Sequence, residues 1–421
     1  MPLTLAEKII SRAADSAAVR PGQIVTCRVD LAMMHDSGGP RRVAPHLERL
    51  GARVWDPDKV VIVSDHFVPP TDVDSAEILA LTRRWARDQS IERFYDMQGI
   101  CHVVVQEYGH LRPGMFAVGG DSHSPSGGAV GAFMVGIGAT EMAGVLVTGE
   151  LWIRVPQTDR LHWSGRLGPA LSAKDIMLHL CAAIGMNNDY KVMEFCGPAI
   201  ASLSMMERLV LCNMSAELGA KTGIIAPDAT TLAAVRAAGA SVDDSALGWH
   251  SDPDATFARS LEFDASALEP QVAAPHSPSN SSAASDHGAV RIDQAYIGAC
   301  TGAKLSDLEM AASVLSGRKV ARGVRLLIAP ASARTIQQAA ADGTLATLTA
   351  AGAILLPSGC GACAGYGAGV LADGEVCIAS TARNFKGRMG SSKSHVYLGS
   401  PYTVAASAIK GTIADPREFL A

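Results

Sequence analysis

The sequence predicts an α/β protein. Short apolar runs, many of them rich in β-branched residues, alternate with helical patterns along most of the 421 residues, as in parallel sheets covered by helices. Polar motifs follow several of these runs directly, where the carboxyl ends of strands meet ligands in α/β folds. The runs that predict strands are Val60–Val63, Met115–Val118, Val324–Ala329, Ala353–Leu356 and Val376–Ala379, and clear helical patterns are Ser75–Gln89 and Ala333–Ala341.

The composition limits the class of function. Apolar residues make up 48% of the chain and charged residues 18%, which indicates a globular protein. The net charge of −5 gives no basic surface of the kind that binds nucleic acid. Nine cysteines are an odd set with no secretory signal before them, which argues against a disulfide framework.

The N-terminal segment predicts a helix rather than a leader. Thr4 and Glu7 are spaced as a capping box before an apolar stretch, and no charged-then-apolar signal precedes them. The most membrane-like stretch, 127–149, is long enough to span a bilayer but is rich in glycine and contains Glu141. We expect a buried helix there, and hence a cytoplasmic protein without a membrane partner.

One break divides the chain. Residues 269–288 are rich in Pro, Ser, Ala and Asn and show no apolar periodicity, which predicts a linker or exposed loop. The predicted organisation is therefore an α/β domain, a second α/β domain, a linker or loop, and a cysteine-bearing α/β domain. Their predicted ranges are 1–160, 161–268, 269–290 and 291–421.

Two polar motifs follow the first two predicted strands. Asp65 and His66 form an adjacent pair, and Asp121, Ser122 and His123 lie in a loop flanked by glycines. An adjacent carboxylate can orient or charge an imidazole, and glycines let the backbone approach a ligand closely. A hydrolase triad is excluded, because neighbours in one loop cannot easily form one and no G-x-S-x-G elbow is present.

Three further polar groups are candidates. His102 lies between two apolar stretches, where a satisfied core histidine is the simpler interpretation. Asn213 and Glu217 are four apart and would share one helix face, which fits a core network and an active site equally well. Arg383 and Arg388 bracket a glycine turn soon after the last predicted strand. Guanidinium groups there suit carboxylate or phosphate recognition.

Three cysteines carry the most specific pattern. Cys300, Cys360 and Cys363 stand in small-residue loops after apolar runs, with the spacing C-x59-C-x2-C. Zinc would require a fourth ligand, and a thioredoxin-like motif would not need Cys300. An electron-transfer cluster would need a fourth cysteine, for which only Cys377 is near. An iron–sulfur cluster with one iron open to substrate fits best, because the Asp-His and Arg motifs would surround it with acid–base and anion-binding groups.

Together these motifs resemble the aconitase superfamily, specifically the separate large subunits of 3-isopropylmalate dehydratase and homoaconitase. The motifs occur in the family's order, from about Leu5 to the C-terminus. The resemblance implies three aconitase-type α/β domains around a central iron–sulfur cluster, without the family's fourth, swivelling domain. It also implies that Cys300, Cys360 and Cys363 bind a [4Fe-4S] cluster whose open iron acts as a Lewis acid on the substrate.

The same resemblance implies a catalytic set made of carboxylates, histidines and one serine: Asp65, His66, His102, Asp121, Ser122, His123 and Glu217. Each histidine would be held by a carboxylate, with His66 on Asp65, His102 on Asp121 and His123 on Glu217. His66 would protonate the departing hydroxyl. The residues implied in substrate binding are Asn213, Arg383 and Arg388.

By this resemblance the chain is expected to be the large subunit of a hydro-lyase that isomerises 2-isopropylmalate and 3-isopropylmalate in leucine biosynthesis. A separate small subunit with the swivelling domain would be its partner. Gly302 and Ala382 stand where the family usually has Asn. These departures keep related diacids, such as homoaconitate, dimethylmalate or methylmalate, as alternative substrates. A cluster-free relative that binds RNA is a further alternative, which the negative charge does not favour.

Overall fold

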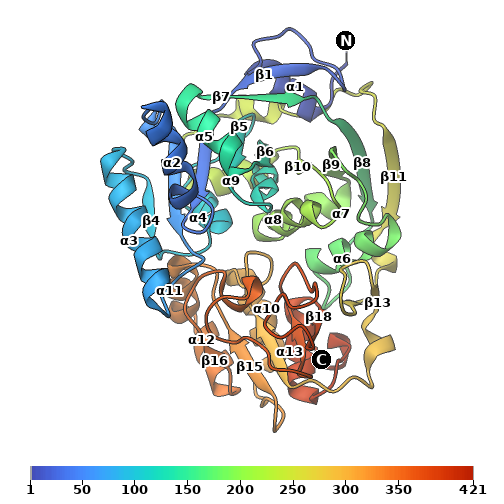
Figure 1. The fold of residues 1–421 in the computed structure, drawn as a ribbon. Helices are drawn as coiled ribbons and strands as arrows, with labels where there is room; N and C mark the ends of the chain where they lie inside the picture. Colours follow the sequence, from blue (N-terminus) through green and yellow to red (C-terminus); the bar gives the residue numbers. More distant parts are fainter. Residues whose placement is uncertain (1, 421) are drawn as a thin grey trace.

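Three sheets built mainly of parallel strands organise the molecule (Figure 1), so the α/β prediction is confirmed. The computed structural model describes residues 2–420. The helices are α1 Leu5–Ala13, α2 Pro40–Leu50, α3 Val73–Asp88, α4 Cys101–Glu107, α5 Ala139–Thr148, α6 Ala173–Ala183, α7 Pro198–Ala201, α8 Met205–Asn213, α9 Ala229–Ala237, α10 Leu305–Leu315, α11 Ala333–Ala341, α12 Thr344–Ala350 and α13 Pro401–Lys410.

The strands are β1 Ile24–Arg28, β2 Leu31–His35, β3 Val60–Ser64, β4 Phe94–Asp96, β5 Phe116–Gly119, β6 Phe133–Gly136, β7 Glu150–Arg154, β8 Gln157–Ser164, β9 Lys191–Cys196, β10 Thr222–Ile225, β11 Arg259–Asp264, β12 Gln271–Ala273, β13 Ser281–Ala283, β14 Gln294–Ile297, β15 Arg325–Ile328, β16 Ile354–Leu355, β17 Val376–Ala379 and β18 His395–Leu398. The predicted strands and helices lie at these positions, although β16 is shorter than expected.

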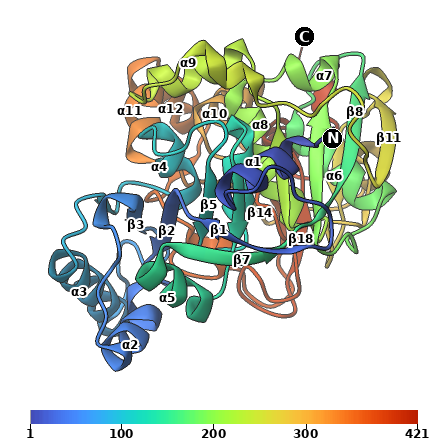
Figure 2. The ribbon, with the colours of Figure 1, turned by 90° about the horizontal axis from the view of Figure 1, so that it is seen from above.

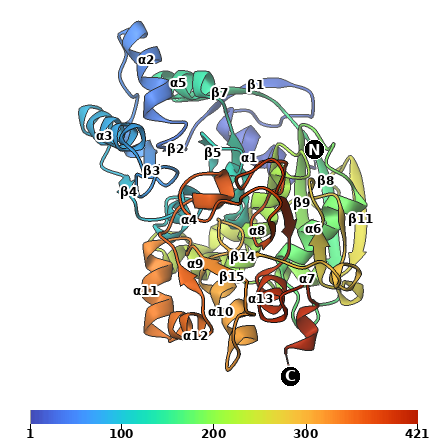
Figure 3. The same cartoon turned by 60° about the horizontal axis from the view of Figure 1, so that its bottom comes forward.

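Each sheet comes from one stretch of the sequence. The first has the order β4-β3-β2-β5-β6, the second β10-β9-β8-β11, and the third β13-β12-β18-β17-β14-β15-β16. In Figure 2 the helices α2, α3 and α5 lie on one side of the molecule, and α6, β8 and β11 lie on the other. Figure 3 shows the orange and red C-terminal part in front of both.

The burial of the strands explains their apolar sequence. All five residues of β3 are buried, as expected for a parallel strand covered on both faces. The same holds for β2, in which His35 is the last residue. Since β2 and β3 are parallel neighbours, the polar residues at their carboxyl ends meet at one edge of the sheet.

The buried helix predicted over 127–149 forms only in its second half, at Ala139–Thr148. The chain there forms a 3-10 turn at Ser124–Val130, then strand β6 and helix α5. Pairing of β6 with β5 completes the first sheet, and this tertiary contact overrides the local apolar pattern. Within residues 2–420, no helix is both long and apolar enough to cross a bilayer.

The segment 269–290, predicted as a linker or exposed loop, contains two short strands and is tied to the third sheet. β12 pairs with β13, and Ala273 of β12 pairs with Leu398 of β18, so the segment extends the third sheet. Gln271 donates its backbone N–H to the buried Asp175 Oδ1 at 2.9 Å. Hydrogen bonds between strands satisfy the backbone N–H and C=O groups of this segment, although its side chains show no apolar pattern. The boundary expected at 160 lies inside β8.

A backbone joint links the first and third sheets. Ile100 donates its N–H to the carbonyl of Ala331 at 2.8 Å, and Ala333 donates to the carbonyl of Gln98 at 3.0 Å. Gly99 lies between these bonds with φ +135°, and a Cβ there would stand 2.6 Å from the Cα of Ser332. The start of α4 is therefore fixed against the third sheet.

We predict that Gly99→Ala lowers the unfolding free energy by about 1–3 kcal/mol, because the added methyl meets backbone and the φ angle disfavours alanine. Urea unfolding followed by circular dichroism measures this. The control is Gly144→Ala in α5, where a Cβ meets nothing within 4 Å; it should raise stability by roughly 0.5–1 kcal/mol. Equal changes in stability for the two variants would show that the close backbone contact at Gly99 does not hold α4 against the third sheet.

Candidate active site

The three predicted cysteines line one cavity of about 370 Å³. Cys300 follows β14, while Cys360 and Cys363 follow β16 at a short 3-10 turn over Gly361–Ala364. Because β14, β15 and β16 are parallel neighbours, both loops emerge at the same edge of the third sheet. The remaining residues that line the cavity are His35, Ser37, Gly38, Arg42, His66, His102, Gly120, Asp121, Ser122, His123, Ala299, Ala364, Tyr366, Ala382, Arg383 and Arg388.

The thiols are placed for a cationic group. Burial raises the pKa of Cys300 to about 12. Burial, together with Asp65 and Cys363, raises the pKa of Cys360 well above its ordinary value. Thiols in this setting ionise only when a cation takes them as ligands. Cys377, considered above as a fourth ligand, is instead fully buried in β17 and is absent from the described lining of the cavity.

The first histidine of the site rests on Asp65. His66 Nδ1 lies 2.6 Å from Asp65 Oδ1, and Asp65 Oδ2 accepts the backbone N–H of Cys101 at 2.7 Å. Burial alone would raise the pKa of Asp65, but His66 holds it at about 2. Burial alone would lower the pKa of His66, but Asp65 raises it to about 9. At neutral pH the imidazole is therefore charged and can give up a proton.

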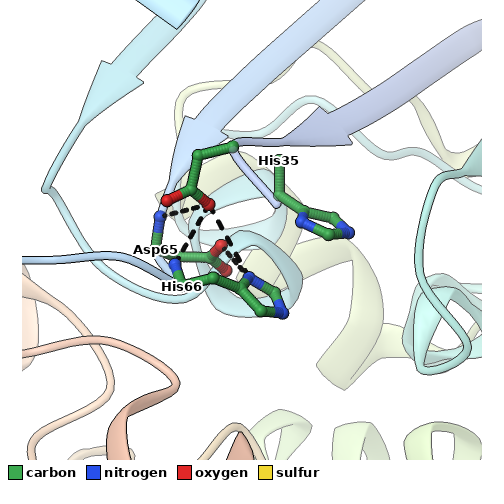
Figure 4. Close-up of side chains that lie close together, drawn as sticks. His35, Asp65 and His66 are labelled. Carbon is green, nitrogen blue, oxygen red and sulfur yellow. Dashed lines mark hydrogen bonds and ion pairs between the residues drawn. The ribbon is translucent and has the colours of Figure 1, made fainter. Parts of the chain in front are cut away.

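His35 lines the cavity but was not among the predicted site residues. Its ring lies beside that of His66 (Figure 4), and the two stack with centroids 4.2 Å apart. Asp36, the next residue, accepts backbone N–H groups from His66 at 3.1 Å and Phe67 at 2.9 Å. The signal was available, because Asp36 is a polar residue directly after an apolar run, as at the other motifs.

The second and third histidines belong to one network. His102 Nε2 lies 2.9 Å from Asp121 Oδ1, which also accepts the backbone N–H of His123 at 2.8 Å. His123 Nε2 lies 3.0 Å from Glu217 Oε1, to which Arg383 Nε donates at 2.7 Å. Burial would raise the pKa of Glu217, but His123 and Arg383 lower it.

The remaining predicted residues surround the thiols. Asn213 ends α8 and donates from Nδ2 to Cys300 Sγ at 3.2 Å. A 3-10 turn separates it from Glu217, so the two do not share one helix face as predicted. Arg388 Nε donates to the carbonyl of Cys363 at 2.7 Å. Ser122 is exposed and lines the cavity.

The structure accounts for Gly302. A Cβ at this position would stand 2.2 Å from Ser380 Oγ and 2.3 Å from its Cβ. Ser380 Oγ lies 3.1 Å from both the N–H of Gly298 and the carbonyl of Gly302. Ser380 therefore fills the space that a side chain at position 302 would need. Its hydroxyl also bonds two backbone groups of the loop that carries Cys300. Ala382 is buried and lines the same cavity.

Comparison with known proteins places these features in one family. Residues 7–411 match the model of the aconitase family (aconitate hydratase). The chain is 46% identical over the whole of both chains to the 3-isopropylmalate dehydratase large subunit 1 of Methanopyrus kandleri. It is 43% identical to the 3-isopropylmalate dehydratase large subunit of Nitratidesulfovibrio vulgaris, over 99% of each chain.

Two further likenesses bear on substrate and fold. The probable methanogen homoaconitase large subunit of Methanothermobacter thermautotrophicus is 43% identical, over 99% of this chain and 98% of that one. The crystal structure of holo aconitase X from Thermococcus kodakaraensis superposes with a TM-score of 0.52 over 91% of this chain and 90% of that chain, at 12% identity. At that identity the likeness concerns the fold alone.

We predict that Gly302→Ala costs about 1–3 kcal/mol of stability by crowding Ser380. In a Ser380→Gly background the same change should cost less, because the crowded side chain is gone. Urea unfolding of the four proteins in this cycle measures the coupling. A cost for Gly302→Ala that is the same in both backgrounds would show that Ser380 does not fill the space.

We predict that Asp65→Asn lowers the pKa of His66 from about 9. Burial lowers this pKa, and the variant lacks the negative charge of Asp65 that counteracts burial. The raised pKa means that the proton on His66 stabilises the fold fully below the ordinary value of 6.5. This contribution is lost as the pH rises through about 9. Titration of ¹⁵N-labelled histidines by NMR measures the shift. His110, whose pKa burial lowers to about 4, is the internal control and should not move; an unchanged His66 would contradict the pairing.

Proposed function

Because the chain belongs to the aconitase family, we propose that it is the large subunit of a [4Fe-4S] hydro-lyase acting on a hydroxy di- or tricarboxylic acid. The observation that carries the proposal is the shared cavity, which is lined by three cysteines, three carboxylate-bonded histidines and three arginines. Full-length relatives called 3-isopropylmalate dehydratase large subunits support the same reaction class.

The donor set fits a cluster held by three cysteines. Cys300, Cys360 and Cys363 would be its ligands, and Asn213 Nδ2 already donates to Cys300 Sγ. The buried Asn213 Oδ1 and Tyr296 hydroxyl have no hydrogen-bond partner among the described residues. Both groups are therefore free to form a hydrogen bond with a bound group. When bound, a cluster with one iron free of cysteine supplies a Lewis acid for the substrate hydroxyl.

The side chains of this chain would donate a proton, bind a carboxylate and orient the histidines. His66, charged at neutral pH, donates its proton to the departing hydroxyl, which leaves as water. Arg383 and Arg388 face the cavity and would bind a substrate carboxylate. Asp121 and Glu217 fix the orientation of His102 and His123. The carbon-bound proton would pass to a base on the partner subunit.

We propose 3-isopropylmalate and 2-isopropylmalate as the substrates, in leucine biosynthesis, with homoaconitate as the second candidate. Identities of 46% and 43% to relatives with these two names favour the first only slightly. The names of both relatives include "large subunit", which supports a separate small subunit as partner. The nine free cysteines support a reducing, cytoplasmic location.

We predict that Cys300→Ser, Cys360→Ser and Cys363→Ser each abolish most of the visible absorption of the protein reconstituted with iron and sulfide under anaerobic conditions. Each removes one of three ligands to the cluster. Cys377→Ala is the matched control and should keep the absorption, because that thiol lies in the core of β17. Loss of absorption only in the Cys377 variant would contradict the assignment of ligands.

We predict that the chain interconverts 2-isopropylmalate and 3-isopropylmalate only when co-expressed with its small subunit. The expected activity of the reconstituted chain alone is at background, because a base and part of the substrate pocket are missing. The assay follows the absorbance of the unsaturated intermediate and is repeated with homoaconitate. Full activity from this chain alone would contradict the need for a partner.

A further inference from the structure

Lys174 is a buried ammonium group between the cysteine loop and the arginine loop. It is the second residue of α6 and only 1% exposed. Its Nζ donates to Thr301 Oγ1 at 3.0 Å and to the carbonyl of Thr381 at 2.8 Å. Thr301 is next to Cys300, and Thr381 is two residues before Arg383. Lys174, from the part of the chain that forms the second sheet, thus bonds two loops of the third sheet, those of Thr301 and Thr381.

The acceptors of this ammonium are all neutral. The third contact of Nζ is Met214 Sδ at 3.5 Å, and no ion pair to Lys174 occurs in residues 2–420. Glu217 and Asp307, the carboxylates whose charges act on Lys174, pair with other cations. Arg383 Nε lies 2.7 Å from Glu217, and Lys304 Nζ lies 2.5 Å from Asp307.

An unpaired buried charge is costly. Removing an ammonium from water costs several kcal/mol unless an anion compensates for it. A cation at the first turn of a helix also opposes the helix dipole. Burial lowers the pKa of Lys174 to about 8, although the charge of Glu217 opposes this shift. No carboxylate of residues 2–420 forms a direct ion pair with this ammonium, whose hydrogen-bond acceptors are neutral.

The missing anion has an evident place. Lys174 Nζ bonds Thr301, the residue that follows Cys300, and a cluster held by three thiolates would carry a net negative charge. Resting on the cluster assigned above, we propose that Lys174 is a positioning residue that fixes the loop of Cys300 and serves as the buried counter-charge of the cluster. Its cost in the cluster-free chain would be recovered when the three cysteines bind the cluster as thiolates and make the site anionic overall.

A buried charged residue usually destabilises a protein when it is replaced, but for Lys174 we expect the cluster-free chain to tolerate the replacement. Replacing Lys174 by the uncharged methionine removes a destabilising charge from the cluster-free chain and a compensating charge from the loaded one. Lys304 is the matched control, since it is equally buried but paired with Asp307. Lys304→Met leaves Asp307 without its cation and should destabilise the cluster-free chain.

The experiment compares wild type, Lys174→Met, Lys174→Gln and Lys304→Met. Thermal unfolding of the chelated chains is followed by circular dichroism. Loss of cluster from the reconstituted chains is followed by visible absorption in the presence of an iron chelator. We expect Lys174→Gln to keep or raise the Tm of the cluster-free chain, and both Lys174 variants to lose the cluster about tenfold faster. Lys174→Gln, which keeps a hydrogen-bond donor, separates the charge from the hydrogen bonds.

Cluster loss at the wild-type rate in both Lys174 variants would overturn the proposal. So would a fall in the Tm of the cluster-free Lys174→Gln chain as large as that of Lys304→Met. A wild-type chain that takes up no cluster would refute the proposed function and this inference together. Wild-type uptake with unaffected Lys174 variants would refute the inference alone.

Discussion

The site depends on one buried carboxylate, that of Asp65. Its side chain bonds His66 and the backbone N–H of Cys101, beside His102, and its carbonyl accepts the N–H of Cys360 at 2.8 Å. A single residue therefore connects two histidines of the first sheet to a cysteine loop of the third. Gly359 permits this approach, since a Cβ there would lie 2.8 Å from the Asp65 carbonyl. The acid–base groups and the thiols cannot move apart without breaking these bonds.

The charges around the cavity follow a common pattern. Burial would raise the pKa of Asp121 and of Glu217, but the histidines beside both and Arg383 beside Glu217 hold it below the ordinary value. The thiols, in contrast, are held neutral by burial in the cluster-free chain. Binding of a metal group changes this balance, because the thiols become thiolates. Arg388, which donates to the carbonyl of Cys363, and Lys174, which donates to Thr301 beside Cys300, would then lie near anions.

Much of this arrangement could be predicted from local sequence, because strand ends and the motifs after them are local features. Val376–Ala379 was placed correctly in this way. His35 was missed because it belongs to an apolar run, and only the pairing of β2 with β3 brings it beside His66. Lys174 reads as an ordinary residue of a helix start, and its burial arises from packing between two distant segments. The segment 269–290 lacks an apolar pattern because its order comes from sheet hydrogen bonds.

The central claim is that three cysteines hold a cluster with one iron left for the substrate. Mössbauer spectroscopy of the complex of large and small subunits, reconstituted with ⁵⁷Fe, tests it most directly. The predicted result is a single iron subsite distinct from the others, whose isomer shift and quadrupole splitting change when 3-isopropylmalate is added. Iron sites that are all equivalent and unaffected by substrate would contradict the claim.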